Sequence, residues 1–161
     1  MGKLIFLGLT AFLTCVDIGI KSCAENSIKR GEEHEFADGK ILVRKVYNKG
    51  MALNTLEDQP EVVKQVATGS AILLTIYQLF ALFQKGQFIK KLGLSLMVAG
   101  AWGNVFDRWV RGYVIDYISF KTKWEKLTNV TFNLADGLIF DGSILVMLAA
   151  FLPGNRKGKG E

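Results

Sequence analysis

Residues 66–84 of this 161-residue chain form a run without a single charged side chain, VATGSAILLTIYQLFALFQ. A helix needs about 20 apolar residues to cross the hydrocarbon core of a bilayer, so this run is long enough to span a membrane. It also lacks the polar stripe that a helix on the surface of a water-soluble protein presents to solvent. The run therefore predicts a membrane protein.

Three further charge-free stretches predict three more membrane helices. They cover Leu4–Val16, Leu92–Phe106 and Gly142–Asn155, and each reaches membrane length only when a flanking Asp is included. Together with the first run they predict one integral-membrane domain over residues 1–161, with helices at 3–21, 66–84, 92–111 and 134–153. The alternative is a soluble bundle of very apolar helices, which the absence of a polar stripe argues against.

The N-terminal helix could instead be a removable signal peptide, with Lys3 ahead of its apolar core. Thr14 is a poor small residue for a position just before Cys15, and Asp17 and Lys21 continue the segment. We therefore expect the first helix to be retained.

The positions of the basic residues predict the orientation in the membrane. They gather in the short link between the second and third helices and in the last residues: Lys85, Lys90, Lys91, Arg156, Lys157 and Lys159. Because such segments tend to stay in the cytoplasm, we expect both termini inside and the loops 22–65 and 112–133 outside. They also account for the net charge of +5 without a nucleic-acid partner.

The long loop at 22–65 predicts a small β element. Within KILVRKVYNKGMALN, residues 40–54, a β-branched alternating run at 41–47 indicates a strand and 48–50 indicate a turn. A short amphipathic helix at 60–65 is expected on the membrane surface. The predicted fold is therefore an all-α membrane protein with a small extracytoplasmic β element and a short interfacial helix.

Cys15 and Cys23 would lie roughly 12 Å apart on one helix, too far for a disulfide, and we expect free thiols with Cys15 in the core.

Polar residues gather where this topology places three helix ends at one level of the membrane. Asn104, Asp107 and Arg108 share a helix face, and Asp116 follows between Ile115 and Tyr117. Snorkelling explains a charge such as Arg111, but it does not explain an isolated acid among apolar neighbours. At the start of the last helix, Asn133 and Asp136 fit a helix cap about as well as they fit a functional site. Both interpretations remain open for them.

Asp116 and Asp136 border the same outer loop and can face each other at the membrane edge. Two close carboxyl groups in a poorly solvated site share a proton, because both cannot easily ionise. The ionised group can take a proton from water while the protonated group donates a hydrogen bond to a substrate carbonyl. This is aspartic-protease chemistry, so no metal or cofactor is expected.

Four motif blocks in the sequence together resemble those of the lipoprotein signal peptidase family, also called signal peptidase II. They are NKGMALN at 48–54, GNVFDR at 103–108, VIDYI at 114–118 and FNLADGLIFDG at 132–142, with DIGIK at 17–21 as a further match. Their order, their spacing and the four spans agree with the family. One departure is Leu53, where the family's turn block more often has Phe.

The resemblance implies a membrane aspartyl endopeptidase of the bacterial inner membrane, with its active site near the extracytoplasmic face. Its substrate would be a diacylglyceryl-modified prolipoprotein, cut just before the lipidated cysteine, and the cyclic peptide globomycin would inhibit it. The catalytic residues would be Asp116 and Asp136. The supporting residues would be Asn48, Gly50, Asn104, Asp107, Arg108, Asn133, Asp17 and Lys21. We expect a monomer in contact with membrane lipid.

Two other functional classes are alternatives to the peptidase. A small transporter or proton relay would carry acids near the bilayer centre on several helices, whereas the acids here lie near helix ends. An inactive peptidase-like scaffold would lack one of the two catalytic acids, and both are present. Asp141 belongs to none of the recognised motifs, and the sequence assigns it no role.

Overall fold

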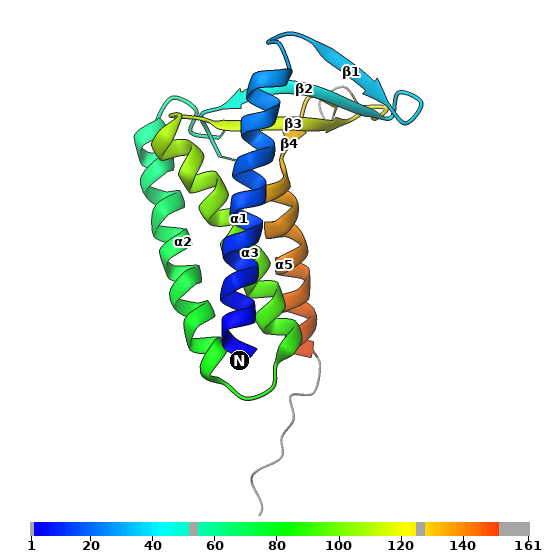
Figure 1. Ribbon diagram of the computed structural model, residues 1–161. Coiled ribbons are helices and arrows are strands. Elements are labelled where there is room, and N and C mark those ends of the chain that lie inside the picture. The colour runs from blue at the N-terminus through cyan, green and yellow to red at the C-terminus, as the bar shows by residue number, and fades with distance from the viewer. Residues whose placement is uncertain (1, 52–54, 125–127, 152–161) are drawn as a thin grey trace, which may run out of the picture.

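Four long helices run alongside one another and a small sheet lies across one end of them (Figure 1). The computed structural model describes residues 2–51, 55–124 and 128–151. The helices are α1 (Gly2–Ser27), α2 (Pro60–Phe83), α3 (Phe88–Val110) and α5 (Leu134–Phe151). The strands are β1 (Glu33–Phe36), β2 (Ile41–Asn48), β3 (Val114–Phe120) and β4 (Thr131–Phe132).

Three of the helices, α1, α2 and α5, are long and apolar enough to cross a membrane. The fourth, α3, is of similar length but occupies the centre of the bundle, where α1, α2 and α5 all pack against it. A helix covered by protein on several sides can carry polar groups there, which fits the many buried residues of α3. A short basic link joins α2 to α3 at the end opposite the sheet (Figure 1).

Glycines allow α3 and α5 to pack closely. A Cβ atom at Gly93 would lie 2.7 Å from the carbonyl oxygen of Gly142, and one at Gly142 would lie 2.5 Å from the carbonyl oxygen of Gly93. No side chain fits at such distances, so the two backbones touch directly. This close approach is typical of helix pairs in membranes, where packing rather than hydrophobic burial drives association.

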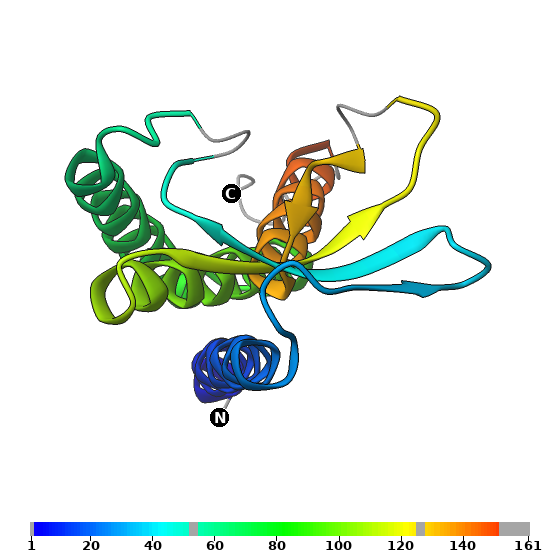
Figure 2. The same cartoon turned by 90° about the horizontal axis from the view of Figure 1, so that it is seen from above.

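The sheet has four antiparallel strands in the order β1-β2-β3-β4. The strand predicted at 41–47 is confirmed, but the all-α fold class is incomplete, because residues 114–120 and 131–132 also join the sheet. A register shift between Val43 and Val46 bends β2 where it passes β3. Seen from above, the β1–β2 hairpin reaches past the helices (Figure 2).

The sheet is held to the bundle by the last turns of α1. Ala24 and Ile28 form a small apolar core with Ile115 and Tyr117 of β3. This contact explains why α1 continues to Ser27 rather than ending near residue 21, as the charge-free run predicted. The helix has to reach beyond its membrane segment to cover one face of the sheet.

Two other expectations were wrong. Residues 60–65 do not form a separate interfacial helix, because they are the first turns of the continuous helix α2. Cys15 is exposed on α1 rather than buried in the core; it and Cys23 are both free thiols. The predicted helices at 92–111 and 134–153 match α3 and α5 within a few residues. Residues 152–153 of the last helix, the basic C-terminal residues and positions 52–54 of the turn block lie outside the described residues.

Candidate active site

Asp116 lies on β3 with its side chain buried beneath the sheet. It is 3 % exposed, and both carboxylate oxygens accept hydrogen bonds from amide side chains. Asn48 Nδ2, on the neighbouring strand β2, lies 3.0 Å from Oδ2, and Asn133 Nδ2 lies 2.6 Å from Oδ1. The pairing of β2 with β3 therefore positions the first of these donors.

Asp136 lies in the first turn of α5, where it completes a reciprocal cap with Asn133. The Asn133 amide N–H donates to Asp136 Oδ2 at 3.1 Å, and the Asp136 amide N–H donates to Asn133 Oδ1 at 3.0 Å. This is the pattern of a capping box, with acid and amide in place of the usual residues. Asp136 Oδ1 also accepts a hydrogen bond from Asn104 Nδ2 of α3 at 3.1 Å. The cap is thus formed, and the same acid also faces the polar cluster on α3.

Asn133 connects the two acids, since its side chain donates to Asp116 and its backbone donates to Asp136. Burial, followed by the nearby charge of Asp136, raises the pKa of Asp116 from 3.8 to about 7, despite the opposing hydrogen bonds from Asn48 and Asn133. Asp116 is therefore able to hold a proton near neutral pH, as one member of a proton-sharing pair does.

A buried cation lies behind Asn104. Lys21 Nζ contacts Asn104 Oδ1 at 2.7 Å, Asp17 Oδ2 at 2.7 Å and Asp107 Oδ2 at 3.5 Å, and its side chain is fully buried with those of both acids. Because the ammonium group has only donors, it fixes the amide of Asn104 with its oxygen toward Lys21. The Asn104 nitrogen is then directed at Asp136.

The two acids that flank Lys21 also connect this network to the backbone of the site. Asp17 Oδ1 accepts a hydrogen bond from the amide of Ala135 at 2.9 Å, and Asp107 Oδ2 accepts one from the amide of Ile115 at 3.2 Å. Each acid thus holds the residue next to one of the two candidate catalytic carboxyls. Gly103 makes this possible, because a Cβ atom there would collide with Asp17 Oδ2.

Arg108 links α3 to the turn that follows β2. Its Nη2 donates to the carbonyl oxygen of Gly50 at 2.9 Å, and its Nη1 donates to the carbonyl oxygen of Asn104 at 3.2 Å. Gly50 in turn donates its amide to Asn48 Oδ1 at 2.9 Å. The predicted residues Asn48, Gly50, Asn104 and Arg108 are therefore part of one continuous network.

A cavity of about 720 Å³ adjoins both acids. Its walls come from the sheet, from α3, from α5 and from the turn after β2. The polar lining includes the two acids with Asn48, Asn104 and Arg108, and the rest of the lining includes Phe120, Thr122, Val130, Thr131, Phe132, Ile139, Phe140 and Ser143. The second group is mostly apolar, so the cavity combines a polar end with an apolar end.

One contributor was missed by sequence reasoning, and another has a contact that the sequence did not indicate. The hydroxyl oxygen of Tyr117 accepts a hydrogen bond from the first amide of α5, at Leu134, over 3.1 Å. Arg111, interpreted as a snorkelling charge, pairs with Asp107 and donates to Ser22 Oγ at 2.6 Å. The i, i+4 spacing indicated the Asp107–Arg111 pair, but nothing in the sequence indicated the contact of Tyr117 with a residue 17 positions away.

Asp141 lies on α5, exposed, and takes no part in this cluster. Among the described residues, no group of three or more His, Cys, Asp or Glu side chains is arranged to hold a metal ion. The groups that the structure does bring together at the site, two carboxyls with amide and guanidinium donors around them, can transfer protons.

The chain is similar to several known proteins. Residues 9–152 match the family model described as signal peptidase (SPase) II. A lipoprotein signal peptidase of Cronobacter sakazakii is 31 % identical over 157 residues, covering 94 % of this chain and 92 % of that protein. One from Vibrio parahaemolyticus is 32 % identical over 154 residues, covering 91 % and 86 %. One from Fusobacterium nucleatum is 28 % identical, with coverage of 91 % and 86 %.

The fold has solved counterparts as well. A bacterial membrane enzyme superimposes with a TM-score of 0.79 at 22 % identity, over 98 % of this chain and 93 % of that one. A second such structure gives a TM-score of 0.74 at 21 % identity, over 93 % and 94 %. At these identities the likeness establishes the fold.

Proposed function

Since the chain belongs to the signal peptidase II family, we propose that it is the aspartic endopeptidase that removes the signal peptide from diacylglyceryl-modified prolipoproteins. The cut falls immediately before the lipidated cysteine, and Asp116 and Asp136 form the catalytic dyad. The observation that supports this most directly is the pair of carboxyl groups joined by Asn133 at the wall of one cavity.

The surroundings of the two acids support different roles for them. Asp136 accepts a backbone N–H and the Asn104 amide at the N-terminus of α5, where the helix dipole favours negative charge. Asp116 is buried and its pKa is raised to about 7. Asp136 is therefore the carboxylate that accepts a proton, and Asp116 is the carboxyl that donates one. The titration itself belongs to the pair, so the pH profile reports both groups together.

Hydrolysis then follows in two steps. Asp136 takes a proton from a water molecule as its oxygen attacks the scissile carbonyl carbon, and Asp116 gives its proton to the carbonyl oxygen. The resulting gem-diol collapses as the carbon–nitrogen bond breaks. Asp136 returns its proton to the leaving amine, and Asp116 regains a proton from the diol as the new carboxyl group forms. One water is consumed and both acids end as they began.

The proposed membrane setting adds α3 as a fourth span to the three apolar helices. Both termini then lie in the cytoplasm, and the sheet and the dyad lie near the extracytoplasmic face of the bacterial inner membrane. A substrate with a signal-peptide helix and acyl chains stays in the bilayer, so it enters laterally between helices. We expect the enzyme to act as a monomer that globomycin inhibits.

The test is a gel-shift assay with a purified diacylglyceryl prolipoprotein in lipid. The unmodified enzyme should release the signal peptide in a reaction that globomycin blocks and that EDTA leaves unchanged. Asp116→Asn and Asp136→Asn should each abolish release, while the exposed acid variant Asp141→Asn on the same helix should cleave normally. Cleavage by either dyad variant at the normal rate, or inhibition by EDTA that added metal reverses, would contradict the proposal.

A further inference from the structure

One wall of the cavity includes the shortest strand of the sheet, which is held in place by few backbone contacts. We call this wall the outer wall; it consists of Phe120, Thr122, Val130, Thr131 and Phe132. Its strand β4 has two residues and pairs with β3 at only two positions, Ile118 with Phe132 and Ser119 with Thr131. An isolated pairing of this length is marginal in water, so other contacts have to hold β4 against the sheet.

One side chain of β2, two strands away from β4, supplies several such contacts. Arg44 of β2 donates from Nε to Ser119 Oγ at 3.1 Å and to Thr131 Oγ1 at 3.3 Å. It also donates from Nη2 to the carbonyl oxygen of Thr128 at 2.9 Å, in the segment that leads into β4. A fourth contact runs from Nη1 to Glu33 of β1 at 3.0 Å.

Most of the hydrogen bonds of Arg44 lie in a part of the sheet that is shielded from water. The Arg44 side chain is 16 % exposed, and Ser119 is fully buried, so these bonds are well shielded from water, whereas Glu33 is 50 % exposed. A guanidinium group presents its donors in a fixed fork, which a lysine cannot reproduce. The fork therefore joins β1, β3, β4 and the segment before β4 through one residue.

We propose that Arg44 is a positioning residue for substrate binding: it holds the outer wall in the conformation that receives an apolar part of the substrate. This rests on the peptidase function proposed above. The outer wall is apolar where Phe120 and Phe132 pack at 6.2 Å between ring centres, and Phe140 lines the same cavity from α5. The acyl chains of the modified cysteine and the apolar core of a signal peptide share this chemistry.

The dyad does not depend on Arg44 directly. The groups that donate to Asp116 and Asp136 belong to Asn48, Asn104 and Asn133, whereas the hydrogen bonds of Arg44 go to Ser119, Thr131, Glu33 and Thr128. Loss of the fork should therefore weaken binding while the chemical step proceeds.

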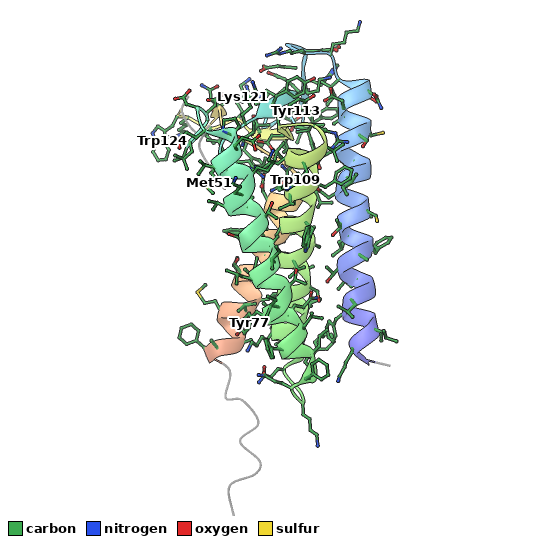
Figure 3. All side chains as sticks on the ribbon, turned by 90° about the vertical axis from the view of Figure 1, so that its left-hand side faces the viewer. Met51, Tyr77, Trp109, Tyr113, Lys121 and Trp124 are labelled. Carbon is green, nitrogen blue, oxygen red and sulfur yellow. The ribbon has the colours of Figure 1, made fainter. Side chains whose placement is uncertain are left out.

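Figure 3 shows that Trp124, which lies in the segment between β3 and β4, is at the sheet end of the molecule, whereas Tyr77 is near the opposite end.

The first experiment measures KM and kcat for a diacylglyceryl peptide in lipid nanodiscs. Arg44→Gln should raise KM about tenfold and change kcat less than about twofold, which identifies an interaction that contributes equally to the bound and transition states. Arg44→Lys should resemble Arg44→Gln. The matched control is Glu33→Ala, which removes the acceptor of the exposed arm and keeps the arms that hold the outer wall; its KM should be unchanged.

The second experiment restores the wall without arginine. Ser119 and Thr131 face each other across the β3–β4 pair, with hydroxyl oxygens 3.0 Å apart, so cysteines at both positions are suited to a disulfide. In the Arg44→Gln protein, Ser119→Cys with Thr131→Cys should return KM to normal when oxidised and lose the gain when reduced. Cys15 and Cys23 are replaced by alanine in all proteins compared, to prevent other disulfides.

Amide hydrogen exchange of residues 120–124 and 128–132 gives a readout that does not require activity. Exchange there should speed up in Arg44→Gln and slow again in the oxidised double-cysteine protein. The KM penalty should vanish with short-chain diacyl peptides if the wall receives acyl chains and persist if it receives the signal peptide; either result supports the proposal.

Other outcomes overturn the proposal. An unchanged KM in Arg44→Gln would overturn it, and so would a loss confined to kcat or an oxidised pair that fails to restore KM. Should Arg44→Gln fail to fold, Thr131→Val removes one arm of the fork, and an unchanged KM there overturns the proposal as well. If the unmodified chain fails to cleave any lipidated peptide, the peptidase function itself has failed instead.

Discussion

Replacing Asp116 by asparagine should stabilise the protein at alkaline pH while it abolishes activity. An acid whose pKa is raised in the folded state binds its proton more tightly there than in the unfolded chain. Its contribution to stability is therefore fully present below the unfolded pKa and is lost as the pH rises toward the folded pKa. For Asp116 the window runs from 3.8 to about 7.

The size of the effect follows from the same shift. One pKa unit corresponds to about 1.4 kcal/mol, so holding the ionised Asp116 in its buried place at pH 8 destabilises the fold by up to about 4 kcal/mol. Asparagine removes this penalty, but its NH₂ group faces one of the two amide donors, from Asn48 or Asn133, and loses that hydrogen bond, at about 1–2 kcal/mol. The net gain at pH 8 should be about 2–3 kcal/mol.

The sign should reverse in acid. Near pH 4 the folded Asp116 is protonated and carries no penalty, so Asp116→Asn should be less stable than the unmodified protein by about 1–2 kcal/mol. At pH 8 the gain should raise Tm by about 5–10 °C, on the scale known for soluble domains of this length.

Thermal unfolding in nanodiscs from pH 4 to pH 8 measures this difference. Asp136→Asn is the matched control, and it should lower Tm at pH 8, because the Asp136 carboxylate accepts two N–H donors at a helix N-terminus. A stability difference between Asp116→Asn and the unmodified protein that does not vary with pH would refute the reasoning. An inactive variant with lower Tm at pH 8 would refute it equally.

Three further predictions follow from the site. Asn48→Ala removes a donor that stabilises ionised Asp116, so the alkaline fall of kcat/KM should move up by about one pH unit in a pH–rate profile; a shift to lower pH would contradict this. Lys21→Met leaves two buried acids unpaired and should destabilise the protein by about 3–5 kcal/mol in chemical unfolding, whereas the exposed pair lost in Lys64→Met should matter by less than about 1 kcal/mol. Equal effects would disprove the buried-cation argument. Tyr117→Phe removes the hydroxyl that receives the first amide of α5 and should lower stability by about 1 kcal/mol with a modest loss of kcat; an unchanged Tm would show that the bond contributes nothing.

The membrane helices were predictable because a bilayer imposes a simple requirement. A span must be long and apolar, and residues 66–84 satisfy this without reference to any other part of the chain. The same rule explains the errors at helix ends. It describes the segment within the hydrocarbon core, whereas α1 continues to Ser27, where its last turns pack against the sheet, and α2 already begins at Pro60.

The sheet was predicted only in part, for a reason that concerns pairing. An alternating, β-branched run such as 41–47 indicates a strand by itself. The two residues of β4 carry no such pattern and form a strand only because β3 and Arg44 lie beside them. Strand pairing between distant segments is a property of the folded chain.

Sequence by itself determined which residues are costly to place at a membrane and therefore need a reason: Asp17, Lys21, Asp107, Asp116 and Asp136. The tertiary structure decided how they are satisfied. Lys21 lies between two acids and turns the Asn104 amide toward Asp136, and Asn133 contacts both members of the proposed dyad. The direction of an amide and the raised pKa of a carboxyl both depend on atoms within a few ångströms in space, and spacing along the chain does not contain that information.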